Sequence, residues 1–200
     1  MQSVSTSAPQ LVLASASPRR RELLTQAGYT FRVEAADIPE DPLPGEDPIA
    51  YVTRLAREKA EAIRSRLASE NTAIILGADT TVVVDRQILG KPASAEDAAR
   101  MLRLLSGRTH QVITGVAALS ATQTLTAAEI TAVQFFSLSE AEIADYVSTG
   151  EPIDKAGAYA IQGRAACWIP AIHGCYFNVV GLPLALVSTL LAALSPDQPA

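Results

Sequence analysis

The spacing of apolar and polar residues predicts a chain in which strands and helices interleave. Runs of β-branched and other apolar residues, and stretches in which polarity alternates, predict strands. The expected strands cover residues 11–13, 29–35, 74–75, 82–84, 109–119, 125–136, 166–169 and 175–180. Apolar residues three or four positions apart, bounded by capping residues, predict helices. The expected helices cover residues 17–28, 47–68, 95–106, 139–149 and 181–194.

This order of elements predicts an α/β fold with a mixed, twisted sheet and flanking helices. Residues 109–119 and 125–136 are separated by a short turn, so we expect them to pair as antiparallel strands. A length of 200 residues suits one domain, or one core with two lobes. Residues 1–10 are rich in Ser, Thr, Gln and Pro, and we expect them, like residues 195–200, to form a flexible tail.

Composition narrows the class of protein. The formal net charge of −5 argues against a stable nucleic-acid complex but leaves room for a local basic cleft. Residues 1–10 lack the pattern of a secretion signal, and the longest apolar stretch, 182–194, is shorter than the ~20 residues that span a bilayer. Cys167 and Cys175 do not form a C-x-x-C motif, and we expect reduced thiols. These features predict a soluble, cytoplasmic protein.

An unusual helix start follows the first strand. Ser17 is a suitable N-cap and Pro18 suits the first helical position. Three arginines, 19–21, then occupy the first turn, where each opposes the helix dipole at a cost of roughly 0.3–1 kcal/mol. The Ser15 hydroxyl, free helix N–H groups and the guanidinium groups of Arg19 and Arg20 suit a phosphate-binding pocket. The alternative is a solvated basic helix end.

Two further stretches place charges beside apolar elements. Lys59 lies on the edge of the buried face of helix 47–68, where it either snorkels to solvent or points into a cleft. Asp79 lies between two apolar runs, where a carboxylate is costly unless it is paired or binds a cation. Asp79 is therefore a candidate metal ligand or catalytic group, and the alternative is a residue that caps or turns the chain.

Loops and turns supply the remaining polar candidates. Residues 37–48 hold four prolines and five acidic residues, among them Glu40, and must form a loop. Lys91 lies at a turn, and on composition alone it is an ordinary surface lysine. Small residues at 156–158 predict a close backbone approach to a ligand or a neighbouring strand, with Asp154, Lys155 and Gln162 as the polar groups beside it. His110 has no nearby Cys or His partner, so we interpret it as structural.

Several of these stretches together resemble the Maf family of nucleotide pyrophosphatases. The matching segments, in order, are LASASPRRRELL from Leu13, LAREKA from Leu55, GADT from Gly77, GKP from Gly90, SGRTHQVITGVA from Ser106, IQG from Ile161 and VGLP from Val180. The resemblance extends over residues 11–194. It implies a single domain with two lobes around a deep cleft, a fold like that of inosine triphosphatase, and a homodimer.

The chain departs from the family pattern at two places. An Ile-Asp-Glu pattern of the family is Ile38-Pro39-Glu40 here, so the glutamate matches and the aspartate does not. Asp37 or Asp41 is open as a replacement. A glycine of the family is Ala160 here, and the added methyl group bears on the backbone freedom next to Gln162.

The resemblance also implies an activity, the hydrolysis of a nucleoside triphosphate to a monophosphate and pyrophosphate. The triplets 78–80 and 161–163 are similar to the branch that acts on dTTP and UTP. The implied catalytic residues are Asp79, Lys59, Lys91 and Glu40. The implied substrate-binding residues are Ser15, Arg19, Arg20, Thr80, Asp154, Lys155 and Gln162.

The implied cofactor is Mg²⁺ or Mn²⁺, held by Glu40 and Asp79, because both ions favour carboxylate and water oxygens. Asp79 would bind the metal, activate water, or do both. The chain has no P-loop or dinucleotide-binding glycine motif, and with two His and two Cys it has no basis for a Cys/His metal cluster. The alternative function is a non-catalytic regulator of cell division that binds nucleotide or DNA, and the negative charge disfavours DNA.

Overall fold

A seven-stranded mixed sheet forms the centre of the computed structural model, which describes residues 10–67 and 72–194. The predicted tails therefore lie outside the described residues, apart from Gln10. The strand order is β2-β1-β3-β5-β6-β7, and β4 pairs with β3. The strands are β1 (Leu11–Leu13), β2 (Phe31–Val33), β3 (Ile74–Val84), β4 (Gln87–Leu89), β5 (Thr109–Leu119), β6 (Thr124–Gln134) and β7 (Ala171–His173).

Parallel and antiparallel pairings divide the sheet. Strand β1 runs parallel to β2 and β3, because helices connect these strands. The pairs β3–β4, β3–β5, β5–β6 and β6–β7 are antiparallel. The predicted mixed sheet, and the antiparallel pair about the turn near residue 120, are confirmed.

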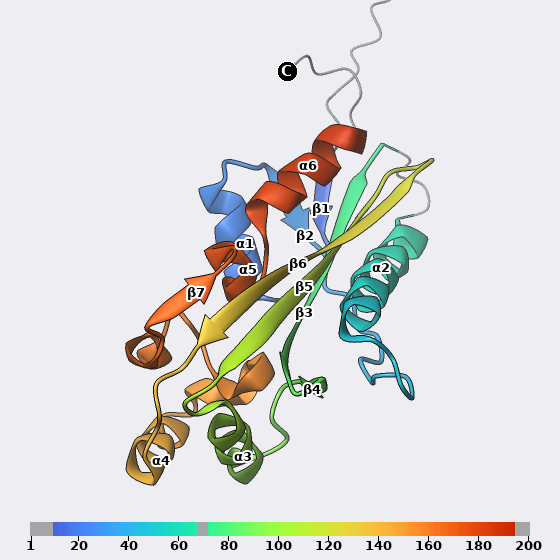
Figure 1. Cartoon of the computed structure of the whole chain (residues 1–200). Coiled ribbons are helices and arrows are strands. Elements are labelled where there is room, and N and C mark those ends of the chain that lie inside the picture. Colours follow the sequence, from blue (N-terminus) through green and yellow to red (C-terminus); the bar gives the residue numbers. More distant parts are fainter. Residues whose placement is uncertain (1–9, 68–71, 195–200) are drawn as a thin grey trace, which may run out of the picture.

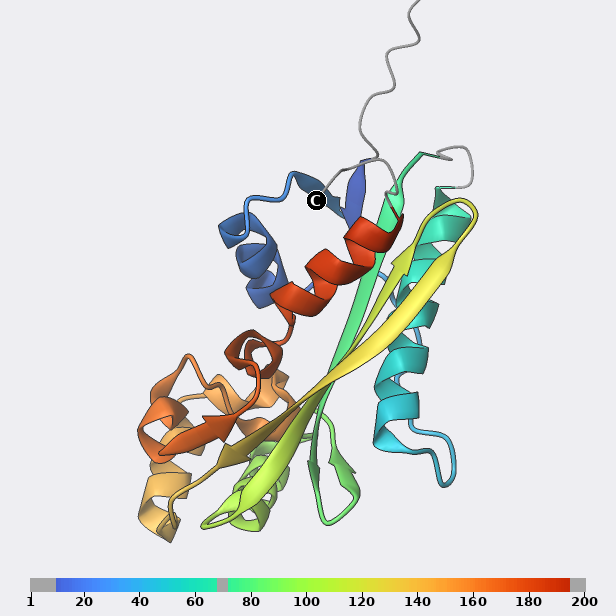
Figure 2. The ribbon, with the colours of Figure 1, turned by 45° about the horizontal axis from the view of Figure 1, so that its top comes forward.

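Helices cover both faces of the sheet. They are α1 (Pro18–Gln26), α2 (Pro48–Arg66), α3 (Ala95–Leu105), α4 (Glu140–Ser148), α5 (Tyr176–Val180) and α6 (Leu184–Leu194). Helix α2 lies on one face, while α1 and α6 lie on the other (Figures 1 and 2). Helices α3 and α4 lie at the far end of the long strands (Figure 1). None of the helices in the described ranges combines the length and the apolar character needed to cross a membrane.

The alternation of side chains along β3 explains the two main cores. Ile75 packs with Ala56, Ala60 and Ile63 of α2 on one face. Leu76, on the opposite face, belongs to a cluster with residues of β1, α1 and α6. Successive strand residues point to opposite faces, so the same alternation continues into the polar residues that follow in β3.

Four predicted strands are corrected by the structure. The runs 74–75 and 82–84 belong to one continuous strand, β3, because Gly77 is accommodated within the ladder. Residues 164–168 form the 3₁₀ helix η3 (Arg164–Trp168) in place of a strand at 166–169. Residues 175–180 contain α5, since the side chain of Asn178 donates to Val112 O and Thr131 Oγ1 from a helical turn. Short apolar runs do not distinguish a strand from a helical turn.

Capping residues define two helix starts near the far end. Ser139 and Glu142 form a complete capping box at the start of α4, since the side chain of each accepts from the backbone N–H of the other. At the start of α3 only half of a capping box is formed, since the Ser94 hydroxyl accepts from the N–H of Asp97. The Asp97 carboxylate accepts from the N–H of Ala93 rather than from that of Ser94.

His110 is a buried structural residue, as its lack of sequence partners predicts. Its Nε2 lies 2.8 Å from the hydroxyl oxygen of Tyr159, and burial lowers the pKa of His110 from 6.5 to about 4. The imidazole of His110 takes up a proton at a higher pH in the unfolded chain than in the folded chain. The neutral imidazole therefore contributes fully to stability above pH 6.5, and this contribution is lost as the pH falls toward 4.

We expect this loss to be measurable in a variant. Between about pH 7 and about pH 4.5, the free energy of unfolding of the wild type should fall by about 2–3 kcal/mol more than that of His110→Gln, which cannot titrate. Urea unfolding at both pH values checks this. Equal losses of unfolding free energy in the two proteins would show that the pKa of His110 is the same in the folded and the unfolded chain.

Candidate active site

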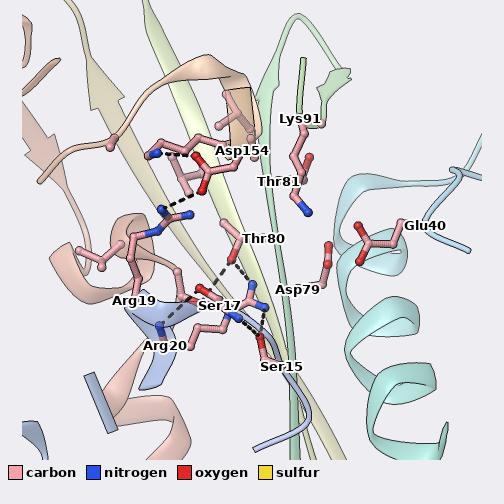
Figure 3. A pocket seen from close by; sticks show the side chains of 18 of the residues that line it. Ser15, Ser17, Arg19, Arg20, Glu40, Asp79, Thr80, Thr81, Lys91 and Asp154 are labelled. Carbon is pink, nitrogen blue, oxygen red and sulfur yellow. Dashed lines mark hydrogen bonds and ion pairs between the residues drawn. The ribbon is translucent and has the colours of Figure 1, made fainter. Parts of the chain in front are cut away.

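All of the site residues predicted from the sequence line one cleft with a volume of about 760 Å³ (Figure 3). They come from the start of α1, the loop before α2, α2 itself, β3, the turn after β4 and the segment 154–162. The residues are Ser15, Arg19, Arg20, Glu40, Lys59, Asp79, Thr80, Lys91, Asp154, Lys155 and Gln162. Asp41, one of the two acids left open as a replacement, also lines the cleft, and Asp37 does not.

Strand β3 presents Asp79 and Thr80 to opposite faces of the sheet. Asp79 contacts Lys59 of α2, whereas Thr80 contacts Arg20 of α1. This division follows from the alternation of side chains along a strand. The adjacent residues Asp79 and Thr80 therefore contact the two helices on opposite faces of the sheet.

Two glycines allow α2 to approach the sheet closely. A Cβ on Gly77 would lie 2.0 Å from the carbonyl oxygen of Ala56, and one on Gly115 would lie 2.3 Å from that of Val52. Gly115 pairs with Asp79 in the β3–β5 ladder. The bare backbone at these positions lets the helix lie directly on the strands, which brings Lys59 beside Asp79. Glycine inside an apolar strand is the sequence signal for such an approach.

The Lys59 ammonium group joins two carboxylates. Its Nζ lies 2.5 Å from Glu40 Oε1 and 2.6 Å from Asp79 Oδ1. The Lys59 residue is only 7% exposed, so the snorkelling alternative is wrong. Burying this ammonium group is tolerable because both carboxylates compensate its charge.

The two carboxyl groups on Lys59 have opposite pKa shifts. Burial raises the pKa of Asp79 above its ordinary value, although Lys59 and Arg20 act against this. Partial burial also favours a raised pKa for Glu40. This effect is outweighed by the hydrogen bond and charge of Lys59 and by the charge of Lys91, so the pKa of Glu40 is lowered. Asp79 therefore holds a proton more readily than Glu40 does, as a general base must.

Arg20 is tied to the protein through most of its donors. Its Nε donates to Gly181 O at 2.8 Å, and Nη1 donates to Ala78 O at 2.8 Å and to Ser15 Oγ at 3.2 Å. Its Nη2 donates to Thr80 Oγ1 at 3.0 Å. These contacts occupy four of the five N–H donors of the guanidinium group. Arg20 thus links α1 to β3 and leaves one donor for a ligand.

Arg19 extends across the cleft toward the segment 154–162. Its Nη1 lies 3.6 Å from Asp154 Oδ2, and Lys155 Nζ lies 2.5 Å from Asp154 Oδ1 (Figure 3). Lys91 points into the cleft from the turn after β4 (Figure 3). The chain contains three lysines, Lys59, Lys91 and Lys155, and all three line the cleft. The cleft therefore concentrates cations within an acidic protein.

The small residues at 156–158 approach a neighbouring strand, one of the two predicted alternatives. A Cβ on Gly157 would lie 2.7 Å from Val82 Cγ2 of β3, and the N–H of Gly157 donates to Gly90 O, next to Lys91. Left-handed φ values among the described non-glycine residues occur at Asp85, Arg86 and Ala158. Ala160 is not among them, so its methyl group imposes no left-handed strain beside Gln162.

The donor set suits a hard divalent cation only in part. Among the described residues, no group of three or more His, Cys, Asp or Glu side chains could hold a metal ion. Glu40 and Asp79 both contact the same atom, Lys59 Nζ. Two carboxylates nevertheless fit Mg²⁺, which usually takes one or two carboxylates and completes its coordination with waters and substrate phosphates.

The sequence of almost the whole described chain matches the profile of one protein family. The sequence profile described as "Maf-like protein" matches residues 10–194. The chain belongs to the Maf family. The resemblance predicted from the sequence motifs is therefore confirmed.

Two Maf relatives with the same name are similar to this chain over most of its length. A protein of Koribacter versatilis named dTTP/UTP pyrophosphatase is 51% identical over 90% of this chain and 92% of its own. A protein of Geobacter metallireducens with that name is 55% identical over 88% of this chain and 91% of its own. The structure of the Staphylococcus aureus Ham1 protein shares the fold of this Maf chain, with a TM-score of 0.52, 13% identity and coverage of 92% and 98%.

Proposed function

We propose that this Maf-family chain is a nucleoside triphosphate pyrophosphatase that hydrolyses dTTP and UTP to the monophosphate and pyrophosphate. The observation that carries the proposal is the pair of carboxylates held on buried Lys59, facing Arg19, Lys91 and Lys155 across one cleft. The names of the two Maf relatives support the choice of substrates. A polyphosphate is the ligand that such an arrangement of cations suits.

The chemistry follows from the roles that these side chains can take. Water attacks the α-phosphorus, its proton passes to the carboxylate of Asp79, and the bond from the α-phosphorus to the bridging oxygen breaks. Pyrophosphate leaves with that oxygen. Arg19, Lys91 and Lys155 neutralise the charge that builds up on the leaving group. Lys59 keeps Asp79 and Glu40 oriented toward the same point.

The proposal includes a divalent metal ion. Glu40 and Asp79 would hold Mg²⁺ or Mn²⁺ together with the triphosphate, and the ion would supply a Lewis acid that polarises phosphoryl oxygens. Removal of divalent ions with a chelator is expected to abolish turnover, and added Mg²⁺ or Mn²⁺ is expected to restore it. Full turnover in excess chelator would contradict this part of the proposal.

Product analysis in ¹⁸O-labelled water tests the reaction itself. We expect thymidine or uridine monophosphate plus pyrophosphate, with the label in the monophosphate, because water attacks the α-phosphorus. Diphosphate plus orthophosphate would reject the proposal, and so would label found in pyrophosphate. Binding of nucleotide without turnover would favour a regulatory protein.

We further propose that Gln162 reads the base. Uracil and thymine present an acceptor, an N–H donor and an acceptor along one edge, and an amide can serve O4 and N3–H together. Gln162 lines the cleft, and so do Tyr159 and Val179, whose apolar surfaces suit a base. Thr80 is less suited to this role, because its hydroxyl contacts Arg20 and Thr114.

Gln162→Glu is expected to lower kcat/KM for UTP and dTTP by roughly 10- to 200-fold, because an ionised carboxylate faces O4 without a donor. A 7-methyl-GTP substrate should lose less, since its base carries N–H donors and positive charge. The measurement is kcat/KM for the three substrates with both proteins. Unchanged ratios would assign the selectivity to other residues.

Location and assembly are also part of the proposal. Cys167 and Cys175 are both free thiols, which supports a reducing compartment, the cytoplasm. We propose that residues 11–194 form a single domain with two lobes, and that two such chains form a homodimer. Light scattering on the purified full chain gives the mass, and a monomeric mass across the working concentrations would contradict the dimer.

A further inference from the structure

Glu40 reaches Lys59 from a segment that has no regular secondary structure. The loop 34–47 connects β2 to α2 and contains neither helix nor strand. It folds back against the N-terminal end of α2 (Figure 1). The Glu40 side chain is 43% exposed, so burial alone does not fix its place. A loop carboxylate of this kind keeps one orientation only if other contacts offset the entropy of the loop.

Two side chains of α2 hold the loop backbone next to Glu40. The hydroxyl of Tyr51 donates to the carbonyl oxygen of Glu40 at 2.8 Å. The Nη2 of Arg54 donates to the carbonyl oxygen of Asp41 at 3.2 Å. Two consecutive carbonyl groups are therefore tied to the helix that also carries Lys59.

Arg54 also fastens the second half of the loop. Its Nε and Nη2 donate to the two carboxylate oxygens of Glu46 at 2.7 and 2.8 Å, and Glu46 Oε2 accepts from the N–H of Leu43 at 3.0 Å. The side chains of Arg54 and Glu46 are only 18% and 8% exposed. A bidentate pair of this kind fixes direction as well as distance. A single planar group thus joins residues 41 and 46 of the loop to α2.

The electrostatics of this cluster keep it assembled. The hydrogen bond from Arg54 lowers the pKa of Glu46 to about 2, so the pair stays ionised at neutral pH. Arg54 also pairs with Glu58 at 3.2 Å, one turn further along α2, and its guanidinium carbon lies 5.7 Å from the centre of the Tyr51 ring. Glu46, Glu58 and Tyr51 together hold the guanidinium plane on the loop side of the helix.

We propose that Arg54 and Tyr51 are positioning residues, which hold the loop so that Glu40 stays on Lys59 beside Asp79. The inference rests on the proposed function, because it assigns Glu40 a part in turnover. Arg54 is not among the residues that line the cleft. Tyr51 does line it, and the role proposed for its hydroxyl is the hydrogen bond to the Glu40 carbonyl oxygen. Both act through the backbone of residues 40 and 41.

The test compares Arg54→Met with Arg57→Met. Arg57 lies on the same helix, but its side chain is 49% exposed and its ion pair is with Glu61 at 3.5 Å, away from the loop. Arg54→Met is expected to lower kcat for UTP roughly 10- to 100-fold, because a displacement of about 1 Å costs that much, while KM changes little. Amide hydrogen exchange of residues 34–47 should become faster. Arg57→Met should leave kcat, KM and exchange unchanged.

A second variant and a double-mutant cycle separate positioning from folding. Tyr51→Phe removes only the hydroxyl that donates to Glu40 O, and kcat should fall without loss of the folded state. If Arg54 acts through Glu40, adding Arg54→Met to Glu40→Gln should cost no further kcat. Additive losses would overturn the proposal, as would normal kcat and normal loop exchange in Arg54→Met.

The same measurements distinguish failure of the proposed function from failure of the loop tether. Wild-type kcat in Glu40→Gln, with faster loop exchange in Arg54→Met, would contradict the role of Glu40 in turnover and leave the loop tether supported. Loss of kcat in Glu40→Gln, with unchanged kcat in both Arg54→Met and Tyr51→Phe, would overturn the tether and support the role of Glu40.

Discussion

Asp79→Asn is expected to lower kcat for dTTP and UTP by roughly 10²- to 10⁴-fold, the range for loss of a general base. The amide neither accepts a proton from water nor supplies negative charge to a divalent cation. Burial raises the pKa of Asp79, so the wild-type carboxylate is suited to take that proton. Steady-state kinetics with Mg²⁺ at saturating triphosphate measures the loss.

The control for Asp79→Asn is Asp85→Asn. Asp85 follows β3, pairs with Arg108 at 2.6 Å and is not among the residues that line the cleft. Its substitution also removes one carboxylate charge, and kcat should remain at the wild-type value. Circular dichroism should show both variants folded. Normal turnover by Asp79→Asn would refute the role assigned to this carboxylate.

Lys59→Met is expected to have the largest effect on stability. The substitution removes the ammonium group from two carboxylates and leaves Asp79, 7% exposed, without its ion-pair partner. Breaking a buried ion pair from one side typically costs about 3–5 kcal/mol, because the remaining charge is uncompensated. Urea unfolding at neutral pH measures the difference in the free energy of unfolding.

A double variant identifies the cause of that destabilisation. Adding Asp79→Asn to Lys59→Met removes the uncompensated charge, so most of the lost stability should return. Glu40 is partly exposed and can be solvated, so it should contribute little to the loss. A double variant no more stable than Lys59→Met alone would show that the loss comes from packing of the lysine stem.

The sequence predicted elements well where their pattern is long. The helix at 47–68 has a continuous apolar face and was found as α2, and the alternating residues 109–119 were found as β5. The short runs 166–169 and 175–180 were predicted wrongly, because four to six apolar residues fit a helical turn as well as a strand. The buried Asn178, whose amide satisfies acceptors on β5 and β6, favours the helical turn.

The candidate residues were predictable from the sequence, but their partners were not. Motif positions identified Glu40, Lys59 and Asp79, whereas the two contacts of the Lys59 ammonium group depend on how closely α2 packs on the sheet. That distance is set by Gly77 and Gly115, which leave room for the helix backbone. Arg20 matched a phosphate-binding pattern, yet most of its donors serve the protein itself, since four acceptors surround it once the chain is folded.

Four features followed from the sequence alone: the order of the long elements, the mixed α/β class, the family and the polar residues that line the cleft. Local information is sufficient for these, because periodicity, caps and motifs act within a few turns of chain. Which side chains contact one another depends on the folded chain. The contact of Lys59 with Asp79 and the tether from Arg54 to the Glu40 loop depend on sheet register and helix packing, which join distant segments.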